Sequence, residues 1–136
     1  MKKRDILPYN QILVESDRDF LLLQIEYNHI KLIEGTGLHS LLSDIQKYLD
    51  LPDDTEVSIE IIKPIMVLNI LTDNLRELWT NNIDFKNQLK AMNSGEYQYG
   101  HPSPEKENNF KDFEFELFSA SMLIRSKLKT GYTLKV

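Results

Sequence analysis

The sequence contains no cysteine, few residues that interrupt helices, and no long apolar run. The absence of cysteine excludes disulfide scaffolds, zinc ribbons, iron–sulfur clusters and thiol catalysis. Five glycines and five prolines in 136 residues exclude collagen-like and low-complexity chains. The longest uninterrupted apolar runs, such as residues 65–68, are far shorter than the ~20 residues that span a bilayer. We therefore expect a cytoplasmic protein that does not enter a membrane.

Charge is the next property that limits function. Acidic residues outnumber basic ones by 21 to 16, which gives a net charge of −5. This balance argues against a protein that coats nucleic acid, so we expect no direct nucleic-acid binding. Several acids gather between residues 50 and 60, which is typical of a solvated turn. The alternative is a small acidic inhibitor, of the kind carried by mobile elements, that occupies the basic groove of a nucleic-acid-binding protein.

The spacing of apolar residues predicts one mainly α domain: an irregular bundle of four or five helices with a short C-terminal β-strand. Residues 1–15 look like an extended lead-in, because their apolar residues lack helical spacing. Residues 93–109 are rich in Gly, Pro and Asn, which is typical of a mobile loop between an N-terminal helical part (1–92) and a C-terminal helix–strand segment (110–136). The expected helices cover residues 17–33, 38–49, 55–80, 83–92 and 110 to the Thr130-Gly131 turn.

The third expected helix has the most regular pattern. Its apolar residues are spaced alternately by four and three, which predicts one buried seam on a long helix bent at its proline. The seam consists of Val57, Ile61, Pro64, Leu68, Leu71, Leu75 and Leu78. Residues 56–62 also alternate as a strand would, and that alternative stays open. We expect Trp79 to pack in the core, with an exposed recognition patch as the alternative; Tyr97 and Tyr99 either anchor their loop or contact a partner.

The C-terminal segment has two apolar stripes. The first, at helical spacing, consists of Phe113, Leu117, Ala120, Ile124 and Leu128. The second lies on the opposite side of the helix and is followed by a sequence typical of a strand, residues 132–136. A helix that is apolar on two faces and a strand without a partner both need a covering surface. We therefore predict an interface, with a protein partner or a second copy, formed by Phe115, Phe118, Met122, Tyr132 and Leu134.

One stretch of this segment, DFEFELFSASMLIRSKLKTGYTLKV, resembles the opening helix and strand of restriction-endonuclease-like proteins, the PD-(D/E)XK group. The resemblance implies Mg²⁺-dependent phosphodiester hydrolysis, with Glu114 or Glu116 as the helix carboxylate. In that family the metal-binding Asp and the Glu-x-Lys motif lie on later strands, and Val136 is the last residue here. We therefore expect a chain without the catalytic half, which has no catalytic residues and binds no cofactor.

Other chemistry-bearing residues are scattered. His29, His39 and His101 lie far apart in the sequence, so no metal site is expected. Asp84-Phe85-Lys86 spells a D-x-K motif, but it falls between helices. The leading hypothesis is a non-catalytic protein-interaction module: an accessory subunit, or the helical front part of a nuclease-like protein that a partner completes. The alternatives are the acidic inhibitor and a subunit of a metal-dependent nuclease.

Overall fold

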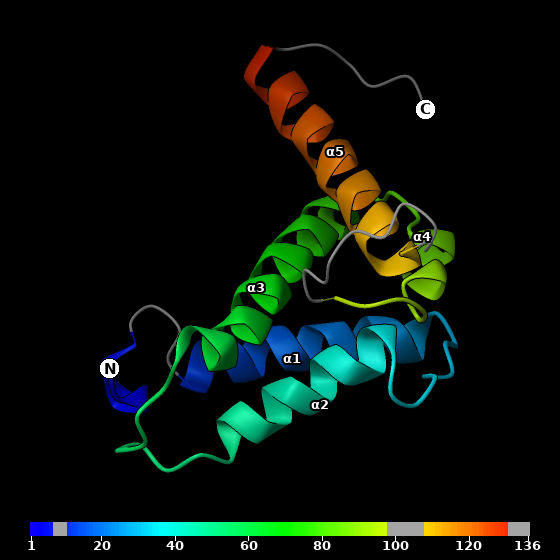
Figure 1. The fold of residues 1–136 in the computed structure, drawn as a ribbon. Coiled ribbons are helices and arrows are strands. Elements are labelled where there is room, and N and C mark those ends of the chain that lie inside the picture. Colours follow the sequence, from blue (N-terminus) through cyan, green and yellow to red (C-terminus); the bar gives the residue numbers. More distant parts are fainter. Residues whose placement is uncertain (7–10, 98–107, 131–136) are drawn as a thin grey trace.

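The computed structural model describes residues 1–6, 11–97 and 108–130, with side chains up to Lys127. The described chain is a mainly helical bundle, as the sequence predicts (Figure 1). Its elements in order are a 3₁₀ turn η1 (Lys3–Asp5), α1 (Gln11–Tyr27), α2 (Gly37–Leu49), α3 (Ile59–Thr80), α4 (Lys86–Ala91) and α5 (Asn109–Thr130). No strand occurs in these ranges. The strand expected at residues 132–136 lies outside them and stays a prediction.

Helix α3 is the centre of the bundle, because α1, α2 and α5 all pack against it. Its predicted seam is confirmed: Val57 and Pro64 are buried, and Ile61 packs partly buried against the core. The remaining members are the most completely buried, namely Leu68, Leu71, Leu75 and Leu78. The helix continues through Pro64, which is its sixth residue.

The predicted bounds of the first helix are wrong at both ends. Helix α1 begins at Gln11 rather than Asp17, so the extended lead-in does not reach residue 15. Asp17 is buried within the helix, where its carboxylate accepts hydrogen bonds from Arg76 at 2.6 Å and Asn69 at 3.2 Å. A side chain that suits a helix start serves here as a tertiary contact between α1 and α3. The helix ends at Tyr27, because His29 adopts a left-handed φ of 54°.

Residues 55–58 are neither helix nor strand. Helix α3 begins at Ile59, and before it the backbone pairs with the N-terminus of the chain. Val57 N–H donates to the carbonyl of Met1 at 2.9 Å, and Lys3 N–H donates to that of Thr55 at 2.9 Å. The predicted helical start at residue 55 is therefore wrong, and so is the alternative strand 56–62. This stretch contains one isolated bridge instead, between Lys2 and Glu56. The local alternation reflects a short extended contact.

The N-terminal segment also closes the end of α2. Lys3 is buried, and its ammonium donates to the carbonyls of Leu49 at 3.0 Å and Leu51 at 2.6 Å. A cation at this position donates hydrogen bonds to carbonyls that the helix leaves unpaired. Its positive charge is also attracted by the partial negative charge at the C-terminus of the helix. The η1 turn is therefore held against the C-terminus of α2, and the predicted extended lead-in is wrong here as well.

The short fourth helix covers Lys86–Ala91 rather than residues 83–92. The carboxylate of Asp84 accepts the backbone N–H of Lys86 at 2.9 Å, which satisfies one of the donors at the helix start. Residues 83–85 form the connection from α3 instead, and within it Phe85 is buried in the core.

Both flanks of the expected loop 93–109 have defined contacts. At its start, Asn93 bridges two backbone groups after α1: it accepts the N–H of Ile33 at 3.1 Å and donates to the carbonyl of Lys31 at 2.6 Å. At its end, Asn108 caps α5 by accepting the N–H of Lys111 at 3.3 Å. Asn108 also donates to the carbonyl of Glu96 at 2.9 Å. Residues 98–107 lie outside the described ranges.

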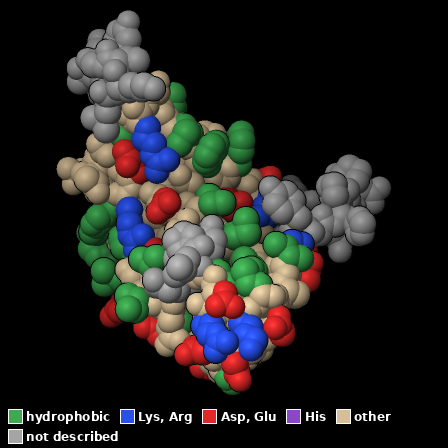
Figure 2. All heavy atoms as spheres, turned by 90° about the vertical axis from the view of Figure 1, so that its left-hand side faces the viewer, with side chains coloured by type: hydrophobic (Ala, Val, Ile, Leu, Met, Phe, Trp, Pro, Cys, Tyr) green, Lys and Arg blue, Asp and Glu red, His purple; other side chains and the backbone are tan. Residues whose placement is uncertain are grey.

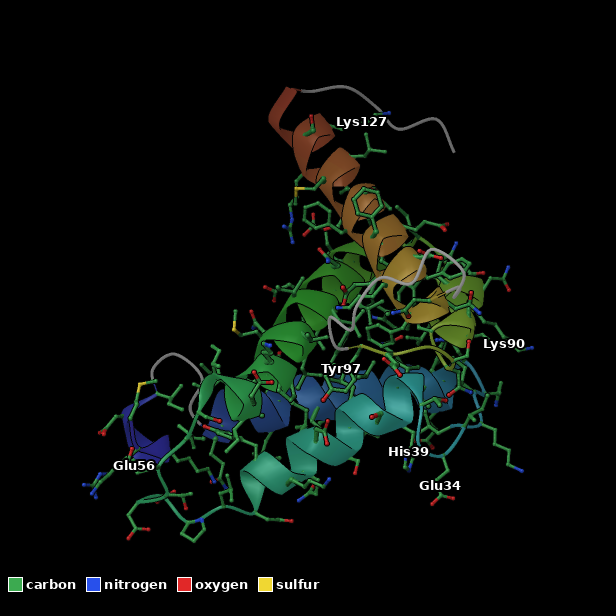
Figure 3. The ribbon with its side chains drawn as sticks, viewed as in Figure 1. Glu34, His39, Glu56, Lys90, Tyr97 and Lys127 are labelled. Carbon is green, nitrogen blue, oxygen red and sulfur yellow. The ribbon has the colours of Figure 1, made fainter. Side chains whose placement is uncertain are left out.

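Tyr97 is the anchor of this junction. It is buried, contacts the ring of Phe110 at 6.3 Å, and donates a hydrogen bond to Asp44 of α2 (labelled in Figure 3). Of the two interpretations of Tyr97, the anchor is therefore the one that the structure supports. Tyr99 lies outside the described residues.

Candidate interaction surface on α5

Helix α5 is attached to the bundle along one side only. Its packing partners are α3 and α4. Leu117 and Ile124 of the first predicted stripe are buried, while Phe113 and Ala120 are partly buried against the same core. The side chain of Leu128 is outside the described part. Figure 1 shows that the C-terminal half of α5 extends away from the other helices.

The second predicted stripe is exposed. The exposed fractions of its side chains are 69% for Phe115, 42% for Phe118 and 36% for Met122. Leu123, at 59%, widens the stripe on its other side. Hydrophobic side chains gather near the top of Figure 2, at the height of the C-terminal half of α5. We call these four residues the α5 apolar face.

Leu123 is the residue of this face that the sequence reasoning missed. Position 123 lies eight residues after Phe115, which places both side chains on the same side of a helix. The pattern i, i+8 was therefore visible in the sequence. Ser119 lies between them in helical position and is partly buried. Tyr132 and Leu134, the remaining predicted interface residues, lie outside the described ranges.

The two glutamates to which the family resemblance points have different surroundings in the structure. Glu114 is largely buried and pairs with the ammonium of Lys111 at 3.1 Å. Burial raises the pKa of the Glu114 carboxyl, and the nearby Lys111 partly offsets that increase. Glu116 is exposed and accepts a hydrogen bond from Gln88 of α4 at 3.0 Å. Both carboxylates therefore have structural partners within α5 and between α5 and α4.

In residues 1–6, 11–97 and 108–130, no three His, Asp or Glu side chains lie together as a metal site would require. His39 accepts the N–H of Gly35 at 3.0 Å at the start of α2, and His29 lies at the end of α1. No helix among the described residues is long and apolar enough to cross a membrane.

The acidic stretch between residues 50 and 60 is partly neutralised by neighbours. The N-terminal ammonium pairs with Glu56 at 2.9 Å, and Lys63 pairs with Glu60 at 3.3 Å (Glu56 is labelled in Figure 3). Both pairs are exposed, so they contribute little to stability. They do reduce the local negative charge that the inhibitor hypothesis needs.

Trp79 corrects another expectation. Its side chain is 43% exposed at the C-terminal end of α3, so it is not a core residue. The reason is its place in the helix: it follows Leu78, the last residue of the buried seam, and points to a different side. Its exposure agrees with the alternative interpretation, an exposed patch.

The comparisons with known proteins give no family. No protein-family model, no curated protein and no solved structure matches this chain. The geometry described above is therefore the only basis for a functional proposal.

Proposed function

We propose that this chain is a non-catalytic protein-interaction module that docks through the α5 apolar face. The observation that carries the proposal is the exposure of Phe115, Phe118, Met122 and Leu123 on a helix whose opposite stripe is already buried. Burying each such side chain is worth about 1.5–3 kcal/mol. Contiguous exposed apolar surface of this kind is typical of protein-binding sites.

The charge order along α5 favours a second copy of the chain as the partner. The first half of the helix carries Asp112, Glu114 and Glu116 with one lysine, whereas the second half carries Arg125, Lys127 and Lys129 with no acid. This order suits the dipole of the helix itself. It also means that two α5 helices attract one another when antiparallel and repel when parallel.

The position of α5 permits such pairing. The C-terminal half extends from the bundle, and Lys127 lies near its outer end (Figures 1 and 3). In an antiparallel arrangement this half lies along the first half of the partner's α5. The apolar face spans residues 115–123, so the two-fold axis passes near Ser119, its midpoint. A two-fold interface uses the same surface on both copies, so the total apolar area buried is twice the area that one copy contributes.

The test is sedimentation of the wild-type chain and of the Phe115→Ser/Phe118→Ser variant. We expect the wild type to form a species of twice 16.0 kDa. Its dissociation constant should lie in the micromolar range, which corresponds to a binding free energy of about −8 kcal/mol. The affinity is no higher because the entropy lost on association offsets much of the free energy gained by burying the apolar face. The double variant should remain monomeric and keep the helical circular dichroism of the wild type, since neither phenylalanine is part of the core.

The matched control is Leu23→Ser, which removes an exposed leucine from α1 instead of α5. We expect it to associate like the wild type. A wild-type chain that stays at 16.0 kDa throughout the micromolar range contradicts the second copy as the partner. Equal loss of association in the control contradicts the α5 apolar face as the surface.

A further inference from the structure

A cleft of about 760 Å³ lies where α1 and α3 end. The two helices run in the same direction: Asp17 contacts Asn69, and Tyr27 contacts Trp79, and the members of each pair are 52 positions apart in the sequence. Their C-termini therefore reach the same place, and the connection 83–85 closes one side of it. None of the residues that line the cleft belongs to the α5 apolar face.

Both helices end in the same way at this cleft. Ile30 N–H donates to the carbonyl of Ile25 at 3.0 Å, and Ile83 N–H donates to that of Leu78 at 3.0 Å. In each case the residue directly before the donor has a left-handed φ, which is 54° at His29 and 58° at Asn82. Glycine is the usual residue at this position of a helix end. Here both positions carry side chains, and both side chains line the cleft.

The aromatic residues provide the second feature. The ring of Tyr27 stands perpendicular to that of Trp79, with centroids 5.1 Å apart, and Phe85 packs behind Trp79 at 6.4 Å. Tyr27 is 64% exposed and Trp79 is 43% exposed, while Phe85 is buried. Two accessible rings at a right angle, supported by a third, offer electron-rich faces to a ligand.

The electrostatics of the cleft favour a positive ligand. A helix C-terminus carries roughly half a negative charge, and two of them meet here. The carboxylate of Asp84 adds a full negative charge at the same cleft, with one oxygen already bonded to the N–H of Lys86. The opposing cationic group is the side chain of Lys86, which also lines the cleft.

We propose that this cleft binds an organic ammonium group that carries methyl substituents. Aromatic faces attract cations most strongly when the cation is poorly hydrated, which holds for methylated ammonium and not for sodium or magnesium. The methyl groups contact the rings of Tyr27 and Trp79, and the charge is balanced by Asp84 and the two helix ends. Free choline-like molecules and methylated lysine side chains share this chemistry.

Trp79 makes the proposal directly measurable, because it is the only tryptophan of the chain. Its fluorescence is recorded while tetramethylammonium, choline or a trimethyllysine peptide is added at constant ionic strength, with sodium chloride as the reference salt. We expect a saturable change with the methylated cations and none with sodium. A response to choline alone assigns a free small molecule, and a tighter response to the peptide assigns a modified side chain; either supports the methylammonium site.

Substitutions identify the groups responsible. Tyr27→Leu should weaken binding about tenfold by removing one ring. Asp84→Asn keeps an oxygen for the Lys86 N–H but removes the charge, so it should weaken binding about threefold or more. Lys86→Gln should strengthen it, because the opposing charge is lost. Phe115→Ser, on the α5 apolar face, is the control and should bind like the wild type.

Three results would overturn the site. The first is the absence of any saturable response at millimolar methylated cation. The second is an equal response to sodium. The third is tighter binding in Asp84→Asn with weaker binding in Lys86→Gln, which would assign the cleft to an anion. Tyr27, Asp84 and Lys86 are all exposed, so these variants test the ligand without removing core packing.

Discussion

Helices α3 and α5 have the same length, 22 residues, and opposite surroundings. Helix α3 lies among α1, α2 and α5, so apolar residues on several of its sides are buried. Among the described helices, α5 packs mainly on α3 and α4, and one of its apolar stripes is buried while the other is exposed. The comparison shows that apolar spacing identifies a face that needs covering, whereas the number of neighbouring helices decides whether the chain covers it itself.

The largest effect is expected in α3. Leu75→Ala should lower the free energy of unfolding by about 2–5 kcal/mol, because it leaves a cavity in a fully buried seam. Ile70→Ala on the same helix is the control; Ile70 is half-exposed, and its loss should change stability by less than about 0.5 kcal/mol. Urea unfolding followed by circular dichroism measures both. Similar small values for the two variants would contradict the central position of α3.

A second pair of substitutions repeats the comparison within α5. Ile124→Ala removes a buried side chain near the outer part of the contact with α3, and should lower stability by about 2 kcal/mol or more. Leu123→Ala removes an exposed neighbour and should leave the stability of the monomer nearly unchanged. Both are measured by urea unfolding at low protein concentration. A larger loss for Leu123→Ala would mean that the apolar face is covered within one chain.

The third prediction concerns the close approach between the start of α2 and residues 92–94. Gly37 has a φ of +52°, and a Cβ added there would lie 2.8 Å from the backbone carbon of Asn93. Gly37→Ala should therefore lower stability by about 1–3 kcal/mol, through backbone strain and the clash together. Gly35→Ala separates the two causes, because Gly35 also has a positive φ, +81°, but has open space around it. An equal loss in both variants would show that the close approach to residues 92–94 has no energetic role.

The smallest effect is the pH dependence contributed by Glu114. Because burial raises its pKa in the folded chain above the usual 4.5, folded protein holds this proton more tightly than unfolded protein. The resulting stability is complete below the unfolded pKa and is lost as the pH rises through the folded pKa. Glu114→Gln removes this loss, so its stability relative to the wild type should rise as the pH increases above the usual carboxyl pKa of 4.5.

The control for this prediction is Glu116→Gln, two residues away on the exposed side of α5. Urea unfolding at several pH values measures both series. A relative stability of Glu114→Gln that falls with increasing pH would contradict the buried position of this carboxyl.

The sequence predicts the helices better than their ends. The seam from Leu68 to Leu78 and the two stripes of α5 follow from spacing, because burial of one side of a helix imposes its period. The start of α1 did not follow, because the carboxylate of Asp17 binds Arg76, a contact 59 residues away. Residues 55–58 were misread for the same reason: their backbone pairs with the first residues of the chain.

The candidate sites were predictable to different degrees. Exposure of Phe115, Phe118 and Met122 follows from the presence of a second stripe opposite a buried one. The cleft at the ends of α1 and α3 could not be predicted, because it depends on the parallel packing of two helices that brings Tyr27 next to Trp79. An aromatic residue at the end of a buried seam is a weak signal, since it suits a core and a cleft equally.

The most direct test of the α5 apolar face uses the absence of cysteine, because single cysteines can be introduced without competing thiols. In an antiparallel pair centred near Ser119, Ser119→Cys should form a disulfide with its own copy under mild oxidation, since the two backbones approach closely there. The Asp112→Cys variant alone and the Ser126→Cys variant alone should form no cross-link. A mixture of the two should cross-link, because position 112 of one copy lies opposite position 126 of the other. Cross-linking of Asp112→Cys with itself, or no cross-linking in any combination, would contradict the proposed interface.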